Sequence, residues 1–449
     1  MGKRQIRIAV SAALQDAGEA TRSLEILKGV RDYAPEGYSV NVRFFSHGGK
    51  FEQKVLDSGF EIYPVSPALD GVGFHNDLRP GRNNFVGSPQ LNLELLKGEI
   101  SALEDCRPDV ILYGFWPFAG IARRIVQPQI PGICFLPLPL EPTVYGCYLM
   151  KDVPDQIRPL TYLPIGLRRK IMKAMPVSLK LKAPILRQTN ILSAAKECGW
   201  HGEPLRNLFD MMKSDLTVVN DLSIYYKGLP IPENFKITGP LYSMPDQNER
   251  VDPEIVKLFQ DGHKGKTNIF CTMGSSGRKE CLLEAIRAVA DLPQERFSAL
   301  VLVPRAVCPL EEAQALVEGK PNILLIERFV PAKLVNAMAD LVICHGGQGT
   351  VQTALASGTP MVGVAMQPEQ QINLDNAVLG GACIRIPITR WRAKNIRAAV
   401  LKIAGESSYR SGAEHLAGFM AEASGREAAA RAIWDFILKL PAEDTNLPS

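Results

Sequence analysis

Two stretches of this chain alternate apolar strand-like runs with helical segments, and this alternation constrains the fold more than any other feature. In the first stretch, segments with apolar residues at helical spacing lie at 23–33 and 91–106. The predicted strands around them are residues 6–12, 38–45, 60–65, 108–113 and, further along, 216–220. These runs are largely apolar and do not alternate strictly with polar residues, which indicates parallel strands covered on both faces. We therefore predict an α/β protein.

A second alternation begins after residue 240. Its predicted strands are residues 267–272, 298–303, 323–326 and 341–344, with a helix at 278–290. Since 449 residues exceed what one core usually supports, we predict two domains facing each other across a cleft. The predicted domains are residues 1–235 and 236–425, followed by a C-terminal segment, 426–449, whose amphipathic helix packs back on the first domain.

Overall charge and cysteine usage exclude several classes of protein. The net charge of +4 is far below the basic excess of a dedicated nucleic-acid binder, so we expect no nucleic-acid partner. The nine cysteines are odd in number and form no C-x-x-C pair, which favours a reducing, cytoplasmic location. We expect no signal peptide and no spanning helix, because no apolar run is long enough. Any membrane contact would be peripheral.

The most informative motif is a glycine-rich turn at residues 344–350, which read Cys-His-Gly-Gly-Gln-Gly-Thr. It follows the predicted strand at 341–344 and precedes a helix-like segment at 351–357. Glycines let the backbone approach a diphosphate, and a helix N-terminus offers it free N–H groups. The turn departs from both the G-x-G-x-x-G and the P-loop patterns, which disfavours dinucleotide and P-loop binding. A tight packing turn is the alternative interpretation.

Neighbouring motifs favour the phosphate site. Phe-Val-Pro stands at residues 329–331, Gly-Thr-Pro at 358–360, Pro-Glu-Gln at 368–370, and Asn373 follows. In letters and spacing this set resembles the signature of family 1 glycosyltransferases of the GT-B fold, which runs from W/F-V-P through H-G-G-x-G-T and G-x-P to D/E-Q-x-x-N. The resemblance is strong over residues 326–386 and is supported by the Thr-Met-Gly-Ser run at 272–275. It is weaker in the first half.

The resemblance implies two Rossmann-like domains, with the acceptor and the catalytic base in the first and the nucleotide-sugar donor in the second. His345 would bind a donor phosphate, the amides of Gly349 and Thr350 the diphosphate, and Glu369 with Gln370 the sugar hydroxyls. Phe329 and Val330 would flank the nucleobase. The full set of donor-site residues that we predict is Gly18, Gly274, Ser275, Phe329, Val330, His345, Gly346, Gly347, Gly349, Thr350, Thr353, Glu369 and Gln370.

Thr353 bears on the choice of nucleotide. Many relatives that use uridine donors carry Glu three positions after the Thr of the glycine motif, where it binds the ribose hydroxyls. Thr353 stands there in this chain, and a hydroxyl cannot accept two hydroxyls as a carboxylate does. Family members that take deoxythymidine diphosphate (dTDP) sugars often carry Thr. The sequence therefore leans toward a dTDP-sugar, with a UDP-sugar as the alternative.

The catalytic base is predicted in the loop after the first strand. In the resembled family this loop reads Gly-His or Gly-Asp; here Gly18 is followed by Glu19, which is the first candidate, with Asp16 second. The alternative is an acidic helix start that complements the dipole. Gly114 stands where a partner carboxylate would follow the strand at 108–113. His47 belongs either to a turn or to the cleft, and no histidine spacing indicates a metal site.

The irregular segment between about residues 136 and 207 is predicted to shape the acceptor pocket. Within it, basic residues alternate with apolar ones over residues 165–187. We interpret this stretch as a solvated helix pair over the pocket; the alternative is a helix lying on an anionic membrane, which would favour a lipid acceptor.

The sequence thus predicts an inverting glycosyltransferase that moves a hexosyl or deoxyhexosyl group from a dTDP- or UDP-sugar to a hydroxyl of a small-molecule or lipid acceptor. The nucleotide sugar is a co-substrate, and we expect no metal or other cofactor. Two alternatives stay open. One is a nucleotide-sugar epimerase or hydrolase of the same fold, and the other is a non-catalytic nucleotide-sugar binding protein.

Overall fold

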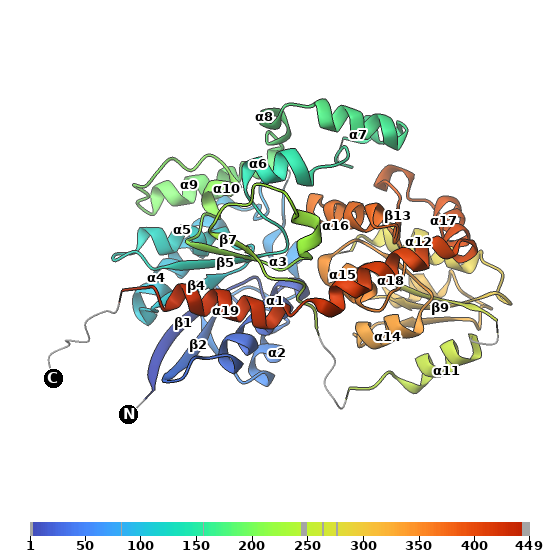
Figure 1. The fold of residues 1–449 in the computed structure, drawn as a ribbon, viewed down its shortest axis with the longest axis horizontal. Coiled ribbons are helices and arrows are strands. Elements are labelled where there is room, and N and C mark those ends of the chain that lie inside the picture. Colours follow the sequence, from blue (N-terminus) through green and yellow to red (C-terminus); the bar gives the residue numbers. More distant parts are fainter. Residues whose placement is uncertain are drawn as a thin grey trace.

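The computed structural model describes residues 3–81, 83–155, 157–243, 249–262, 265–274 and 277–441. Each of its two lobes is built around one sheet, and the two lobes lie side by side (Figure 1). Every strand pairing within the two sheets is parallel.

The first sheet has seven strands in the order β3-β2-β1-β4-β5-β6-β7. Its strands are β1 (Arg4–Ser11), β2 (Tyr38–Ser46), β3 (Glu61–Pro64), β4 (Val110–Tyr113), β5 (Gly132–Leu136), β6 (Leu216–Val219) and β7 (Phe235–Ile237). The order reverses next to β1, as in doubly wound nucleotide-binding folds, where ligands bind at the carboxyl ends of the strands. The loops after β1, β2 and β4 therefore meet at one edge.

Helices connect these strands and cover both faces of the sheet. They are α1 (Ala17–Asp32), α2 (Glu52–Asp57), α3 (Phe74–Leu78), α4 (Pro89–Cys106), α5 (Pro117–Ile125), α6 (Pro142–Val144), η1 (Tyr145–Leu149), η2 (Arg158–Tyr162), α7 (Ile165–Ala174), α8 (Val177–Lys180), η3 (Pro184–Leu186), α9 (Thr189–Glu197), α10 (Leu208–Met211) and η4 (Ser223–Tyr226). The segment from α6 to α10 is the irregular insert that the sequence indicates.

The second sheet has six strands in the order β10-β9-β8-β11-β12-β13, which reproduces the order of the first six strands of the first sheet. Its strands are β8 (Thr267–Thr272), β9 (Phe297–Leu302), β10 (Ile323–Ile326), β11 (Leu341–Cys344), β12 (Met361–Gly363) and β13 (Cys383–Arg385). Its helices are α11 (Pro253–Gly262), α12 (Lys279–Ala290), α13 (Leu310–Gln314), α14 (Ala332–Met338), α15 (Gln348–Ala356), α16 (Pro368–Leu379), η5 (Ile388–Arg390), α17 (Ala393–Gly405) and α18 (Ser407–Glu422).

The strand predictions for both stretches are confirmed, as β1 to β4, β6 and β8 to β11. Burial on both faces explains the apolar runs of the central strands: all four residues of β4 and of β11 are fully buried. Separate apolar clusters cover the two faces of each sheet. The predicted α/β architecture of two Rossmann-like domains is therefore observed.

The last helix, α19 (Gly425–Ile437), lies against the first domain although it follows the second in sequence (Figure 1). Trp434 Nε1 donates to the carbonyl of Val30 in α1 at 2.8 Å, and Arg426 forms an ion pair with Glu25. Residues 442–449 lie outside the described part. The boundary predicted between residues 235 and 236 falls inside β7, which pairs with β6 and so belongs to the first sheet.

Helix α1 begins six residues earlier than the predicted helix at 23–33. Asp16 caps it, because its Oδ1 accepts hydrogen bonds from the N–H groups of Gly18 at 2.6 Å and Glu19 at 3.4 Å. Gly18 and Glu19 thus lie in the first helical turn and not in a loop. Along the described residues, we find no helix that has both the length and the apolar character needed to cross a membrane.

Candidate functional site

The glycine-rich turn follows β11 and leads into α15, as the sequence predicts. The ring of His345 lies between two glycines. A Cβ on Gly274 would come 2.4 Å from its Cε1, and one on Gly347 would come 2.6 Å from its Nε2. Gly346 has φ +79°, a left-handed conformation that favours glycine. Because Gly274 and Gly347 have no side chains, the imidazole of His345 fits between them at the carboxyl end of β11.

His345 is buried, and burial lowers its pKa to about 4, against a smaller opposing effect from the carboxylate of Asp16. Its Nδ1 makes no hydrogen bond within the described residues. At neutral pH the ring is therefore uncharged and can donate one hydrogen bond to an anion, as a neutral imidazole does. Asp16 of the first domain is therefore near enough to the second-domain turn for its charge to act on His345.

The N-terminus of α15 is open. Gly347 is its N-cap, and no side chain caps the helix. The N–H groups of Gln348, Gly349 and Thr350 therefore have no partner within the helix. A Cβ on Gly349 would meet no atom within 4 Å, so packing within the chain does not require a glycine there. This combination of free N–H groups and open space matches an anion site.

Gln348 joins the two domains, which sequence reasoning missed. Its Nε2 donates to the carbonyls of Pro137 at 2.7 Å and Asn220 at 2.9 Å, both in the first domain. Its Oε1 accepts from Arg22 NH1 at 3.0 Å. The residue occupies the variable position of the His-Gly-Gly-x-Gly-Thr pattern, so the family pattern gave no signal for it.

Thr353 lies in α15, the helix that follows the glycine turn, and its side chain is buried. Its hydroxyl lies 2.9 Å from the carbonyl oxygen of Gly349 and 3.1 Å from that of Thr350. Because the hydroxyl hydrogen goes to the helix backbone, Thr353 can offer a ligand only acceptor lone pairs. It cannot replace a carboxylate that binds two ribose hydroxyls.

The predicted sugar-binding pair begins α16. Glu369 Oε1 accepts from Asn373 Nδ2 at 2.7 Å, and the same amide donates to the carbonyl of Gly346 at 3.0 Å. Gln370 is buried, and its Oε1 accepts from the N–H of Met366, which leaves its Nε2 amide for other partners. Burial raises the pKa of Glu369, opposed by the nearby Arg22. These contacts hold α16 against the glycine turn.

The predicted nucleobase residues follow β10. Phe329 is 67% exposed, and its ring lies edge-on to Phe51 of the first domain, with centroids 6.0 Å apart. Val330 is half-buried against the apolar cluster beside α14. An exposed aromatic face at the end of a strand is available for stacking on a base. Gly274 lies beside His345, and Ser275 lies outside the described residues.

The two candidate bases differ in their surroundings. Glu19 is 5% exposed; its Oε1 pairs with Arg22, and its Oε2 accepts from the N–H of Phe115 at 3.1 Å. Burial raises the pKa of Glu19, and Arg22 opposes this. The absence of a side chain at Gly114 makes room for it, since a Cβ there would lie 1.6 Å from Glu19 Oε2. Asp16 is half-exposed at the start of α1.

His47 packs away from the glycine turn. Its Nδ1 lies 3.0 Å from the carbonyl oxygen of Pro67, and its Nε2 lies 3.6 Å from the buried carboxylate of Glu99. Glu99 also accepts from Ser11 and Trp116. His47 thus belongs to a polar cluster beneath the strand ends. Within the described ranges, no group of three metal-ligating side chains is present.

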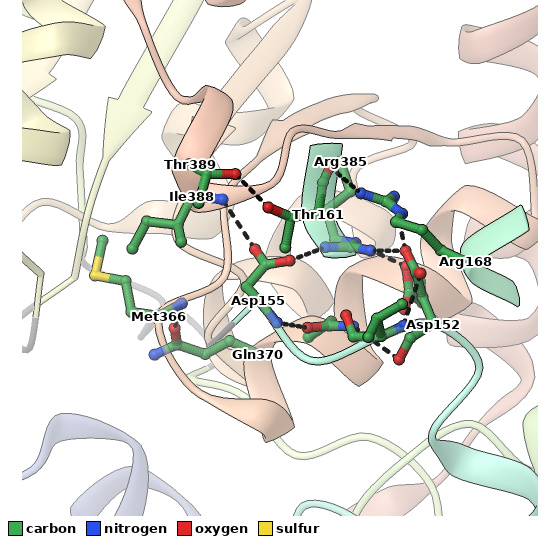
Figure 2. Close-up of polar contacts among 12 residues, drawn as sticks. Asp152, Asp155, Thr161, Arg168, Met366, Gln370, Arg385, Ile388 and Thr389 are labelled. Atoms are coloured by element: carbon green, nitrogen blue, oxygen red, sulfur yellow. Dashed lines mark hydrogen bonds and ion pairs between the residues drawn. The ribbon is translucent and has the colours of Figure 1, made fainter. Parts of the chain in front are cut away.

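A second polar contact between the domains lies beside α16. Arg385 from β13 forms ion pairs with Asp375 at 2.8 Å, with Asp155 at 2.9 Å and with Asp152, and all four side chains are buried (Figure 2). Arg168 in α7 pairs with Asp152 at 2.8 Å. Figure 2 also shows Asp155 accepting from the N–H of Ile388. This cluster fixes the insert of the first domain to the second domain.

Comparison with known proteins finds glycosyltransferases. Residues 307–433 match the family model described as Erythromycin biosynthesis protein CIII-like, C-terminal domain. A PGL/p-HBAD biosynthesis rhamnosyltransferase of Mycobacterium bovis (strain BCG / Pasteur 1173P2) is 28% identical over 367 residues, which cover 79% of this chain and 71% of that protein. This chain is a glycosyltransferase, and it is similar to the macrolide-type enzymes of family 1. The enzyme therefore transfers a sugar from a nucleotide sugar.

Solved structures confirm the GT-B fold of the enzyme. The glycosyltransferase of kitacinnamycin superposes with a TM-score of 0.65 at 21% identity, covering 96% of this chain and 99% of that one. A spinosyn rhamnosyltransferase complexed with thymidine diphosphate has a TM-score of 0.59 at 15% identity, covering 96% and 100%. The same rhamnosyltransferase complexed with spinosyn aglycone has a TM-score of 0.58 at 15% identity, covering 95% and 99%.

Proposed function

We propose that the enzyme inverts the anomeric centre as it moves a hexosyl or deoxyhexosyl group from a dTDP- or UDP-sugar to a hydroxyl of a small-molecule or lipid acceptor. The observation that carries the proposal is the neutral imidazole of His345 beside the open N-terminus of α15, opposite Asp16. In this proposal the second domain supplies the donors for a leaving diphosphate, and the first domain supplies the acceptor for a proton, Asp16, whose charge acts on His345.

The donor half of the site would stabilise the departing nucleoside diphosphate. The N–H groups of Gly349 and Thr350 and the imidazole of His345 supply donors where negative charge develops. Open space at Gly349 gives a phosphate access to these groups. Phe329 would stack on the base, and Glu369 with Gln370 would bind sugar hydroxyls, for which they offer both acceptors and donors. This proposal needs no metal or other cofactor.

Among nucleotides we favour dTDP. The hydroxyl of Thr353 donates within α15, so the chain lacks a carboxylate there for the second ribose hydroxyl of a uridine nucleotide. The spinosyn rhamnosyltransferase complexed with thymidine diphosphate shares the fold and supports this choice.

For the base we favour Asp16 over Glu19. Both oxygens of Glu19 already accept hydrogen bonds, and the side chain is buried in an ion pair. Asp16 accepts the N–H groups of Gly18 and Glu19 through Oδ1, and its charge acts on His345 and Glu369 of the donor half. Asp16 would accept the proton of the acceptor hydroxyl as it attacks, while Glu19 orients Arg22 toward Gln348.

The comparisons also bear on the acceptor. One relative is named for PGL/p-HBAD biosynthesis, and a structural neighbour is complexed with spinosyn aglycone. We propose that the acceptor of this enzyme is likewise a small molecule or a lipid, bound between the insert and the carboxyl ends of the first sheet.

Replacing Gly349 by Ala tests the donor site. Because a Cβ there meets no atom of the chain, we expect the fold to be unaffected, while the methyl group obstructs the diphosphate. The dTDP affinity measured by calorimetry should fall at least about tenfold, or about 1.4 kcal/mol. Gly418→Ala is the matched control, since its Cβ also meets no atom within 4 Å and this exposed residue lies on a different helix, α18. Equal affinity in both variants would place the diphosphate elsewhere.

A further inference from the structure

Residues 157–190 of the insert carry an unusual charge. They contain eight Lys and Arg residues and no Asp or Glu. The whole chain is +4, so the remainder of the chain is net acidic at −4. The positive charge of this protein is therefore concentrated in one segment of 34 residues, which includes η2, α7, α8 and η3.

Two of these basic residues anchor the segment. Arg168 is buried; it pairs with Asp152 and donates to the carbonyl of Thr161 at 3.1 Å. Lys180 is also buried and donates to the carbonyl of Gly146 at 2.9 Å. The segment thus has a fixed attachment to the protein body. Five of the other basic residues of the segment are exposed to solvent, namely Arg158, Lys170, Lys173, Lys182 and Arg187.

The same segment exposes large apolar side chains. Of the fourteen large hydrophobic residues exposed in the described part of the chain, five lie between residues 157 and 179. They are Ile157, Tyr162, Ile165, Leu167 and Leu179. On α7, Leu167 lies on the same outward side as Lys170, while Arg168 and Met172 face inward. Figure 1 shows α7 and α8 at one edge of the molecule, beyond both sheets.

We propose that this surface of η2, α7 and α8 docks on an anionic lipid bilayer. Exposed apolar side chains enter the boundary of the acyl chains, and the flanking Lys and Arg residues pair with anionic headgroups, as in other peripheral helices. A second copy of the chain is a poorer occupant, because a symmetric interface would place this basic surface against itself. Because the segment has basic residues and no acidic ones, it favours a negatively charged partner. Its exposed Leu and Tyr side chains favour a partner that also has an apolar interior, as a bilayer does.

Vesicle flotation with the full chain tests the proposal. Vesicles of phosphatidylcholine mixed equally with phosphatidylserine should carry the protein, and pure phosphatidylcholine should carry much less. The double variant Lys170→Gln/Lys173→Gln should partition roughly thirtyfold more weakly to the mixed vesicles. High salt should weaken the binding of the unmodified protein.

The matched control is Lys394→Gln/Lys402→Gln, which removes two exposed lysines from α17. It should partition like the unmodified protein, and the thermal midpoint of each variant shows that it is folded. Leu167→Gln should weaken binding at low and high salt alike. Equal binding to both vesicle types, or an equal loss in the α17 control, would overturn the proposal. So would a change of oligomeric state by the α7 variant without any change in flotation, which would indicate an interface between copies.

Discussion

Asp16→Asn is expected to lower the rate of sugar transfer by a factor of about 10²–10⁴, the usual contribution of a general base. Asn keeps the oxygen that caps α1 through the N–H of Gly18, so the helix should keep its position. The amide cannot take the proton of the acceptor hydroxyl. Because the donor contacts lie on the other domain, the calorimetric dTDP affinity should change by less than about twofold.

Glu19→Gln serves as the matched comparison. It would leave the buried guanidinium of Arg22 without its carboxylate, so we expect mainly a lower thermal midpoint. If the folded Glu19→Gln protein loses all transfer while Asp16→Asn keeps it, Glu19 is the base and the assignment of Asp16 is wrong.

Arg385→Met is expected to have the largest effect on stability. Burial alone would lower the pKa of Arg385, but Asp375, Asp155 and Asp152 outweigh it and raise the pKa, so the guanidinium is a fixed cation shared by three buried carboxylates. Met would fill much of the space but leave Asp375 and Asp155 without their cation and Asp152 with Arg168 alone. Removing one partner of a buried ion pair costs about 3–5 kcal/mol, and we expect at least that loss. Denaturant unfolding followed by circular dichroism measures it.

Arg390→Met is the control for the loss of an arginine nearby. Arg390 is exposed at the end of η5, and a surface substitution of this kind costs within about 0.5 kcal/mol. If both variants unfold at the same denaturant concentration, the buried cluster does not stabilise the enzyme, and its role in fixing the insert would be contradicted.

The strands that the sequence predicts contain runs of apolar residues that stand out from the segments around them. The four that it does not predict are very short or lie among prolines. β7, β12 and β13 have three residues each, too few to form a recognisable run. β5 lies between Pro131 and Pro137, and prolines on both sides of a short segment are typical of a loop. Helix α1 begins earlier than predicted because its start depends on a cap by Asp16 and not on apolar spacing.

The donor half of the candidate site can be predicted from the sequence because one continuous segment supplies most of its residues. The contacts between the two domains cannot be predicted in this way. Arg22 and Gln348 lie 326 positions apart, and only the closed arrangement of the two sheets brings them within 3.0 Å. The pairing of Glu19 with Arg22, three residues further along α1, does have a local signal in helical spacing. The role of Gly114, whose missing side chain makes room for the carboxylate of Glu19, has no such local signal.

A nucleoside diphosphate is expected to bind at the turn around His345, and calorimetric titration of the unmodified protein with dTDP, UDP, ATP and NAD tests this. We predict one site for dTDP, equal or weaker binding of UDP, and no binding of ATP or NAD. Equal binding of all four nucleotides, or no binding of dTDP and UDP, would show that the turn is not a nucleoside diphosphate site.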